Sequence, residues 1–304
     1  MVRPATGCPA PAPGMEDQID MKPKVFIKNL VEELPFSADI YWALRHRGRT
    51  FHSRFDMEAL SKRLPEIMAQ VKPHIQSTAS GRKVFFFASW HYWIMHAALS
   101  GLTLRGLGYD VTLAYLPYSD YDEPISHFDL RRQDLYARQV LKKAQPFLNI
   151  VPLLDVGQAR DLPEELGKAV EQVTVIDTQY IRQREDVTGK EPVYLLREER
   201  NLEAARRALP CFRENRPDVV IVPNGMIQEY GAVYETARYL DIPAVTYEFG
   251  EQDQRLWLGQ NHQVMYYESF DDLWATRRER KLNDDQHAWL ENFLADYENI
   301  VLVV

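Results

Sequence analysis

Short apolar runs alternate with longer amphipathic stretches over most of the chain, and this pattern predicts an α/β protein. The runs at 83–88, 111–116, 149–154, 218–222 and 244–247 are mostly apolar and rich in β-branched or aromatic residues, as expected of parallel strands covered on both faces. Between them, apolar residues recur every three or four positions, the spacing of helices that pack on a sheet. We therefore expect a doubly wound, mostly parallel Rossmann-like sheet with a helical N-terminal extension.

The rest of the pattern completes the expected order of elements. Helices are expected at 57–71, 90–107, 128–145, 163–173, 194–215, 226–239 and 284–297, short strands at 24–30, 173–176 and 264–267, and irregular segments or loops at 31–53, 177–192 and 249–263. The helix at 194–215 is rich in arginine and glutamate and is expected to expose its outer face. The apolar run 299–304 has the composition of a buried parallel strand.

This order divides the chain into four segments. Residues 1–22 contain four prolines and no periodicity, which predicts a disordered leader. Residues 23–80 form an N-terminal extension, and 81–282 form the Rossmann-like domain. A helix and a strand are expected at 283–304, and so apolar a strand needs neighbours on both sides. It either completes this sheet or starts a second domain beyond this chain, and we favour the second interpretation.

Composition narrows the class of protein. The net charge of −8 argues against a nucleic-acid-binding protein, because phosphate binding needs a concentrated basic surface. Cys8 and Cys211 are the only cysteines, in a tail and a predicted helix, so we expect no disulfide framework and a reducing compartment. No apolar run approaches the ~20 residues that cross a bilayer, and the N-terminus lacks the apolar core of a signal peptide. The sequence favours a cytoplasmic protein.

Polar residues directly follow two of the predicted strands, at the edge where open parallel sheets bind their ligands. Asn224-Gly225 follows the strand at 218–222, and Glu248 follows the strand at 244–247, so we expect them on one rim. Asn224 and Gly225 would place backbone N–H groups at a helix start, which suits an anion or a hydroxyl group. A plain turn with Asn224 as helix N-cap explains the same residues equally well.

Two stretches together resemble a known family. The first is the strand, polar turn and helix start Phe85-Phe86-Phe87-Ala88-Ser89-Trp90-His91; the second is Arg-Pro-Asp-Val-Val-Ile-Val-Pro-Asn-Gly at 216–225 with Leu-Asp-Ile-Pro-Ala-Val-Thr-Tyr-Glu-Phe-Gly at 240–250. Over roughly 80–270 the chain looks like the N-terminal, acceptor-side Rossmann-like half of a GT-B glycosyltransferase of bacterial cell-surface or capsule polysaccharide synthesis. The second stretch is also similar to sugar-nucleotide 2-epimerases.

The resemblance implies sugar transfer from a nucleotide-sugar, as co-substrate, to a glycan or lipid-linked acceptor, with no metal or further cofactor. The donor would be held by a second domain, because the Gly-rich turn and Glu-containing helix of the donor half are missing here. This chain would then supply mainly the acceptor side. A lipid-linked acceptor would bring the protein to the membrane surface. The sequence leaves the oligomeric state open, with a homo-oligomer among the alternatives, and nucleic acid is not an expected partner.

Several residues are candidates for this chemistry, each with a plainer alternative. His91 follows the first strand and suits a general base for an acceptor hydroxyl, or a locally hydrogen-bonded helix start. Glu248 suits the same role or sugar binding, or an ion pair with Arg255. Asp120 beside Tyr121 suits sugar recognition, since rings stack on pyranose faces, but a surface turn has the same composition.

Further substrate-binding candidates lie in the same turns, with plainer roles in the core or in loops. They are Ser89, Trp90, Gly250 and Glu251, beside Asp120, Asn224 and Gly225. The sequence has no His-x-x-x-His, Cys-x-x-Cys, Walker loop or Gly-x-Gly-x-x-Gly at a helix start, which disfavours metal and NAD sites. Two other functions stay open: a sugar-nucleotide 2-epimerase and a non-catalytic binding or scaffold module.

Overall fold

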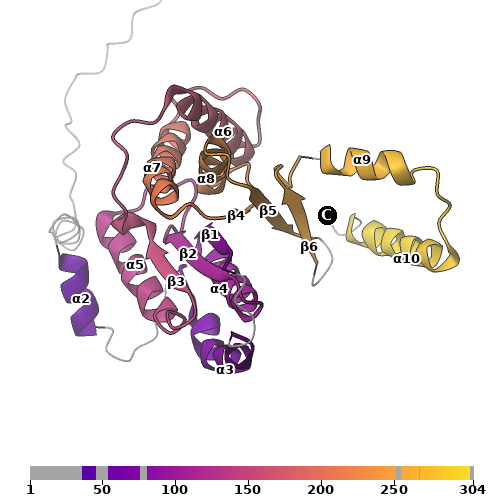
Figure 1. Cartoon of the computed structure of the whole chain (residues 1–304). Helices are drawn as coiled ribbons and strands as arrows, with labels where there is room; N and C mark the ends of the chain where they lie inside the picture. Colours follow the sequence, from indigo (N-terminus) through magenta and orange to yellow (C-terminus); the bar gives the residue numbers. More distant parts are fainter. Residues whose placement is uncertain (1–35, 46–53, 76–80, 251–254, 267, 302–304) are drawn as a thin grey trace, which may run out of the picture.

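The six strands form one mixed sheet, seen in a computed structural model that describes residues 36–45, 54–75, 81–250, 255–266 and 268–301 (Figure 1). The strands are β1 Lys83–Ser89, β2 Asp110–Leu116, β3 Asn149–Pro152, β4 Val219–Pro223, β5 Ala244–Phe249 and β6 Leu256–Gln260. Their order across the sheet is β3-β2-β1-β4-β5-β6. The first five are parallel, and β6 pairs antiparallel with β5. This is the strand order of a Rossmann-like α/β fold.

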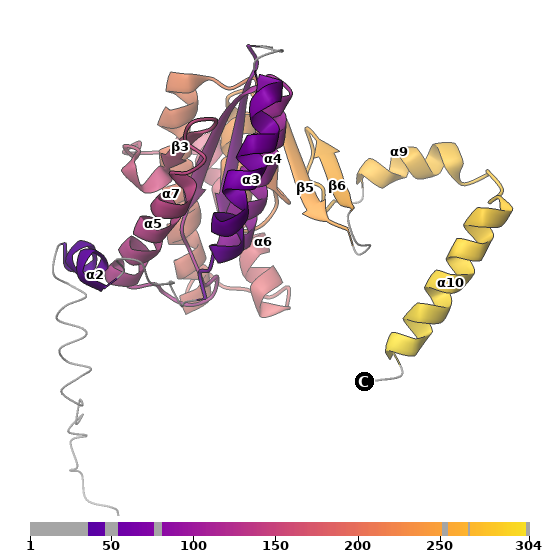
Figure 2. The same ribbon diagram turned by 90° about the horizontal axis from the view of Figure 1, so that it is seen from below.

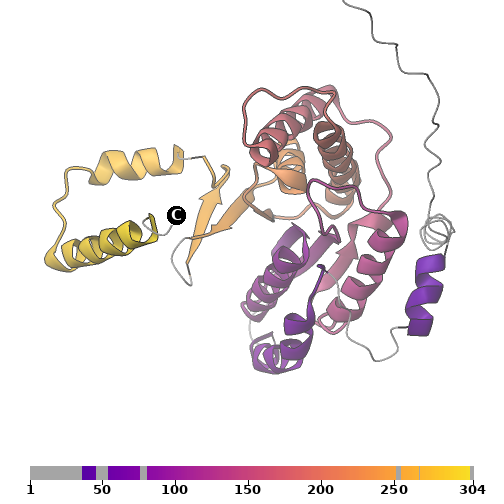
Figure 3. The same ribbon diagram turned by 180° about the vertical axis from the view of Figure 1, so that it is seen from behind.

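Helices cover both faces of the sheet (Figures 1 and 3). They are α2 Ser37–Arg45, α3 Glu58–Ile75, α4 His91–Gly106, α5 His127–Leu141, the 3₁₀ turn η1 Leu153–Asp155, α6 Glu164–Arg182, α7 Pro192–Asn215, α8 Gln228–Tyr239, α9 Glu268–Arg277 and α10 Asp284–Val301. Helices α3 to α5 lie on one face and α6 to α8 on the other, while α9 and α10 project past β6 (Figures 1 and 2). No helix in the described part of the chain is both long and apolar enough to span a bilayer.

Alternation along β1 explains how the central strand is buried on both sides. Phe85 and Phe87 point to one face, where their rings lie 4.9 Å from Phe212 of α7 and 6.1 Å from Tyr230 of α8. The residues between them face the opposite side, toward α4. Every residue from Val84 to Ser89 is buried, as expected of a central parallel strand.

The structure confirms the predicted fold class and the five predicted strands of the parallel sheet. The strand predicted at 173–176 was wrong: α6 runs through these residues, because Val173, Thr174 and Asp177 lie on its buried side. The helix therefore reaches Arg182, through the first six residues of the segment expected as a loop. In the loop expected at 249–263, β6 forms instead, with its first three residues exposed.

The chain ends also differ from expectation. The segment expected to be irregular at 31–53 contains α2, and the predicted strand at 24–30 lies outside the described residues. Val264 to Tyr266 form a turn instead of a strand. Helix α10 continues through 299–301, where we expected a strand. Asn283 caps this helix by accepting from the Gln286 backbone N–H at 2.8 Å, and a helix once started gains one bond per added residue.

Candidate functional site

The strand order reverses between β1 and β4, and strained turns gather at the carboxyl ends of these two strands. Trp90, between β1 and α4, has φ 68° and ψ 140°, a region that favours glycine. Asn224 and Gly225, after β4, have φ 32° and 78°. The Asn224 side-chain oxygen accepts from the Met226 and Ile227 backbone N–H groups at 3.0 and 3.1 Å, so it caps the turn into α8.

The ends of β4 and β5 lie side by side, as the sequence predicts for Asn224 and Glu248. The Asn224 backbone N–H donates to the Tyr247 carbonyl at 2.8 Å, one residue before Glu248. Gly225 packs against Thr246, so there is no room for a side chain at this turn. The backbone N–H groups of Asn224, Met226 and Ile227 all have acceptors within the protein.

A buried chain of charges fills the space behind this turn. The Ser89 hydroxyl donates to Glu229 Oε2 at 2.7 Å, and Glu229 Oε1 accepts from Arg197 at 2.7 Å. Arg197 Nε in turn donates to Asp177 at 2.6 Å, and the Asn201 amide donates to the same Asp177 oxygen at 3.3 Å. Arg197, Asp177 and Glu229 have no exposed surface. We call Ser89, Glu229, Arg197, Asp177 and Asn201 the buried network.

The two carboxylates of the buried network differ in their electrostatics. Burial raises the pKa of Asp177 more than Arg197 lowers it, and its second oxygen has no hydrogen-bond partner. Burial also acts on Glu229, but Arg197 and Arg200 outweigh it and lower the pKa of Glu229. Glu229 is therefore ionised at neutral pH. The Ser89 hydroxyl donates a hydrogen bond to this carboxylate and is fully buried. Its side chain therefore supports the structure and is not accessible to a ligand.

This arrangement closes the crevice that Rossmann-like folds commonly use for a diphosphate. Such a site needs glycine at the first turn, so that the phosphate can approach the backbone at a helix N-terminus. Here Trp90 occupies the turn, and the Tyr230 hydroxyl holds the Ser89 carbonyl at 2.7 Å. The Glu229 charge lies directly behind, which disfavours an anion there.

Helix α7 also holds the loop that follows β2. Arg197 Nη1 donates to the Tyr121 carbonyl at 3.3 Å, and Arg200 Nη2 donates to the Glu123 carbonyl at 2.7 Å. Arg200 Nη1 donates to the Asp120 carbonyl as well. Its guanidinium lies 4.6 Å from the centre of the Tyr118 ring. Three backbone carbonyls of one loop are thus fixed by two arginines, which sets the position of the Tyr121 ring.

Five aromatic rings follow one another along the carboxyl edge of the sheet, and we call them the aromatic rim. Tyr121 stacks on Trp90 at 5.4 Å and 18°, and Trp90 meets Tyr92 edge-on at 5.7 Å. Tyr92 lies 5.4 Å from Trp93, which stacks on Phe249 at 4.6 Å and 10°. Tyr121, Tyr92 and Phe249 remain 39%, 39% and 45% exposed, so the rim presents aromatic surface to solvent.

The two predicted catalytic residues lie in different surroundings. Glu248 is half-buried at the Phe249 end of the aromatic rim, and burial raises its pKa. Burial raises the pKa of Tyr92, and the nearby Glu248 charge adds to this rise. His91 lies 5.9 Å from the Phe55 ring, and burial lowers its pKa although Asp56 opposes this. No contact joins His91 to Glu248 in the described structure.

The other residues predicted to bind substrate form common ion-pair or backbone contacts, or lie outside the described residues. Asp120 forms an ion pair with Arg54 at 3.0 Å, at the Tyr121 end of the aromatic rim. The Gly250 backbone N–H donates to the Arg255 carbonyl at 2.9 Å, beyond the end of β5. Glu251 lies outside the described residues. Arg255 makes no ion pair with Glu248 among the described contacts.

Sequence reasoning missed the buried network, and α7 is the reason. The abundance of arginine and glutamate suggested an exposed outer face, but Arg197, Arg200 and Asn201 are buried. Their spacing of three and four residues places them on one side of the helix, which is the only sequence signal they give. Their partners Asp177 and Glu229 come from α6 and α8, and no local pattern connects these three helices.

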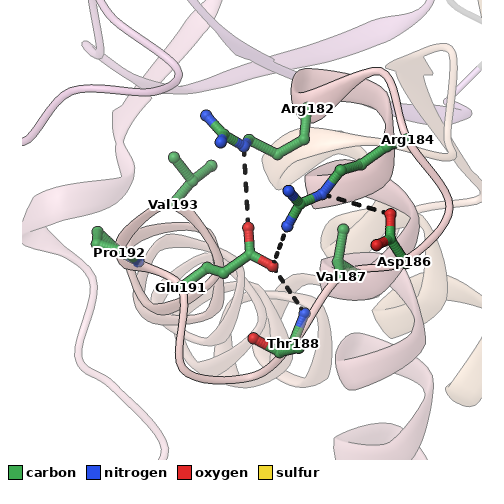
Figure 4. A pocket seen from close by; sticks show the side chains of 8 residues that line it. All are labelled: Arg182, Arg184, Asp186, Val187, Thr188, Glu191, Pro192 and Val193. Atoms are coloured by element: carbon green, nitrogen blue, oxygen red, sulfur yellow. Dashed lines mark hydrogen bonds and ion pairs between the residues drawn. The ribbon is translucent and has the colours of Figure 1, made fainter.

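Two hollows lie near α7. A groove of about 630 Å³ lies beside the loop after β2, lined by Tyr118, Ile125, Leu154, Arg200 and Arg206 among others. A second hollow of about 730 Å³ lies where α6 passes into α7 (Figure 4). There Glu191 accepts from Arg184 at 2.6 Å and from the Thr188 backbone N–H at 2.9 Å (Figure 4). The charged side chains that line this hollow pair with one another, so we interpret the hollow as part of the closed loop between α6 and α7 and not as a ligand site.

No known protein-family model matches the chain, and no curated protein matches its sequence significantly. Within the described residues no group of three His, Cys, Asp or Glu side chains is placed to hold a metal ion. The sheet order defines the class of the protein as a mostly parallel, Rossmann-like α/β fold. These comparisons identify no particular family for the chain.

Proposed function

We propose that the chain binds a glycan along the aromatic rim and serves as the acceptor-side domain of a glycosyltransferase. The observation that carries this proposal is the continuous row of five rings, three of them partly exposed, that ends beside the half-buried carboxyl group of Glu248. Flat rings cover the apolar faces of pyranoses, and carboxylates accept hydrogen bonds from their hydroxyl groups. The rim offers both along one edge.

The charge of the site favours a neutral ligand over an anionic one. Glu229 and Asp177 lie behind the rim, and both carboxylates pair with Arg197. The Arg200 guanidinium donates to backbone carbonyls of the loop after β2. An anion at the turn after β1 would face Glu229 with no free cation of the buried network to balance it. A sugar needs no such cation.

Glu248 is the better candidate for the general base. Its raised pKa brings it closer to neutral pH, and it lies at the end of the rim where an acceptor hydroxyl would be presented. In the proposed step it accepts the hydroxyl proton while the hydroxyl oxygen bonds to the anomeric carbon of the donor sugar. The bond between that carbon and the nucleoside diphosphate breaks, and its electron pair leaves with the diphosphate. His91 meets the rim only edge-on at Tyr92, 5.5 Å away, and its other neighbours are Phe55 and Asp56.

The donor would be bound by another domain. The crevice between β1 and β4 is filled by Trp90, Glu229 and Tyr230, so a diphosphate has no place there. The proposal therefore separates two functions in space, with acceptor binding on this chain and donor binding outside the part described. The 2-epimerase alternative needs a nucleotide site and no acceptor, so the two can be told apart by ligand.

The first test is glycan binding by saturation-transfer NMR and a glycan array, using the whole chain. We expect Tyr121→Ala and Phe249→Ala each to weaken binding by about tenfold, a loss of ~1.4 kcal/mol. Leu107→Ala is the matched control, since Leu107 is 60% exposed at the far end of α4. Absence of glycan binding, or equal loss in all three variants, would disprove the proposed site.

The second test addresses catalysis with nucleotide-sugars and a bound glycan, reading the product by mass spectrometry. Glu248→Gln should keep the glycan affinity and lower transfer at least 100-fold, about 2.7 kcal/mol in the barrier. Transfer should rise with pH as Glu248 ionises. Glycan binding without any transfer by the wild type would support the binding-module alternative. Turnover of a nucleotide-sugar without acceptor would support the epimerase.

A further inference from the structure

Exposed apolar side chains are concentrated in the C-terminal part of the chain. Among the described residues, 18 large hydrophobic side chains are exposed, and nine of them fall between Phe249 and Leu294. These nine are Phe249, Leu256, Trp257, Leu258, Tyr266, Trp274, Leu282, Trp289 and Leu294. Single exposed leucines are ordinary, but a run of this kind marks an interaction surface.

Strand β6 lies at the edge of the sheet and carries none of the usual protection against pairing. Its five residues, Leu-Trp-Leu-Gly-Gln, include no charge and no proline. Leu256 and Leu258 lie on the same face as Phe249, because β5 and β6 pair Phe249 with Leu256 and Tyr247 with Leu258. The edge is therefore apolar, and no strand among the described residues pairs with its outer side.

The hydrogen bonds between β5 and β6 identify which backbone groups point outward. The Asn261 N–H donates to the Ala244 carbonyl at 2.7 Å, and the Gly250 N–H donates to the Arg255 carbonyl at 2.9 Å. In an antiparallel pair the direction of the backbone N–H and carbonyl groups alternates along the strand, so the backbone groups of Trp257 and Gly259 also point toward β5. Leu256, Leu258 and Gln260 direct their backbone groups to the outer edge, where the Gln260 carbonyl also accepts from His262 Nδ1 at 2.9 Å and keeps its second lone pair.

This alternation makes β6 self-complementary. Leu258 is the middle residue of the strand, and its N–H and carbonyl point outward. A two-fold axis midway between the two Leu258 residues would set β6 antiparallel to β6 of a second copy, with Leu258 opposite Leu258. Leu256 would then pair with Gln260 and Trp257 with Gly259, where an aromatic ring shields a glycine. No like charges meet in this register.

The helical arm, α9 and α10, extends in the direction of the expected neighbour. Figures 1 and 2 show both helices beyond β6, on the side away from the other strands. Trp289 and Leu294 of α10 are 49% and 51% exposed, and Trp274 of α9 is 66% exposed. Helices of this length are marginal without tertiary packing, so an apolar partner is required to stabilise them. The exposed face of β5 and β6 in a second copy is such a partner.

We propose that the protein forms a two-fold dimer in which the β6 strands pair through Leu258 and each arm packs on the β5–β6 face of the other copy. The partner that covers this edge is a second copy of this chain. The C-terminal part of the chain supplies the uncharged edge strand, which is complementary to itself, and also the helices with exposed apolar side chains. The pairing joins two six-stranded sheets into one. It also brings the arm of one copy beside Phe249, at the end of the partner's aromatic rim.

The dimer is tested by size-exclusion chromatography with light scattering and by sedimentation of the whole chain. We expect a mass of twice 35.5 kDa for the wild type. Leu258→Pro removes the outward N–H at the centre of the edge, and Leu258→Lys adds a charge that would face its own copy. Both should weaken dimerisation at least tenfold. Leu258→Ala shortens the side chain and keeps the N–H, so its dimer should persist.

Two controls make the result decisive. Leu195→Lys alters a leucine that is 50% exposed on α7 and should leave the dimer intact. Circular dichroism spectra and melting temperatures of all variants show whether each one folds. A monomeric wild type at all concentrations, a dimer that survives Leu258→Pro and Leu258→Lys, or a dimer lost equally in Leu195→Lys would overturn the proposal. Trp289→Glu separates the two contacts: a weaker dimer supports the arm contact, and an unchanged one refutes it.

Discussion

Replacing Arg197 with methionine should be among the most damaging single changes in the sheet domain. Methionine keeps much of the side-chain length but removes the charge that lies 2.6 Å from Asp177 and 2.7 Å from Glu229. Both carboxylates are fully buried and would lose their main counter-charge. Breaking one buried ion pair costs about 3–5 kcal/mol, and here one cation serves two anions. With a typical total of about 5–15 kcal/mol, we expect a loss of at least a third of the free energy of unfolding.

Urea unfolding, followed by tryptophan fluorescence and far-UV circular dichroism, measures this loss if the slope is unchanged. Arg213→Met, on an exposed part of the same helix, is the matched control. The triple variant Arg197→Met, Asp177→Asn, Glu229→Gln should recover much of the loss, because no buried charge remains unpaired. A cost for Arg197→Met below about 1 kcal/mol would refute the reasoning.

The loss should also depend on pH. Without Arg197 the folded-state pKa of Asp177, already raised by burial, rises further, and that of Glu229 rises above its unfolded value. Such a shift costs stability above the unfolded pKa values, so the difference between variant and wild type should shrink as pH falls from 8 to 5. In the wild type the lowered pKa of Glu229 acts the other way: it contributes stability above the ordinary value of 4.5, and this contribution is lost as pH falls below that value. A difference that stays constant with pH would mean that the carboxylates are not the cause.

Three further predictions concern other parts of the site. Ser89→Ala leaves a buried Glu229 oxygen without its donor, so it should cost about 1–3 kcal/mol in urea unfolding while glycan binding persists; complete loss of binding in a folded variant would contradict the structural role. Gly225→Ala places a methyl group against the Thr246 methyl at a positive φ, and should cost about 2 kcal/mol or more, with partial recovery in Gly225→Ala, Thr246→Ser; no recovery would exclude the clash as the cause. Burial lowers the pKa of His96, so the wild type should lose stability as pH falls through 6.5, and His96→Phe should flatten that part of the melting-temperature profile; an equally steep profile would assign the effect to other groups.

The parallel sheet was predictable because its strands are continuous apolar runs bounded by turn residues. Val219 to Val222 and Lys83 to Ala88 carry this signal in their own sequence. Strand β6 was not predictable, because Leu-Trp-Leu-Gly-Gln is short, half apolar and stabilised by pairing with β5. The strand expected at 173–176 failed for the opposite reason: its apolar residues belong to the period of a longer helix.

The candidate site was predictable in place and only in part in composition. Asn224 and Glu248 were expected on one rim because parallel strands end at the same edge, and the hydrogen bond from Asn224 to Tyr247 agrees. The partners of Arg197 could not be found in this way. Asp177 and Glu229 meet it from positions 20 and 32 residues away, on helices whose relative placement only the folded sheet determines.

The position of β1 in the sheet has a consequence for synthesis of the chain. One edge of β1 pairs with β2, which follows soon after, but its other edge waits for β4; the Lys83 backbone N–H bonds to Asp218, 135 residues later. At roughly 5–20 residues per second, a ribosome needs on the order of ten seconds to deliver that partner. During this time Val-Phe-Phe-Phe-Ala presents an unpaired, strongly apolar edge of the kind that seeds aggregation. Yield of native protein should therefore depend on translation speed and on chaperones that cover this strand until residues 219–223 emerge.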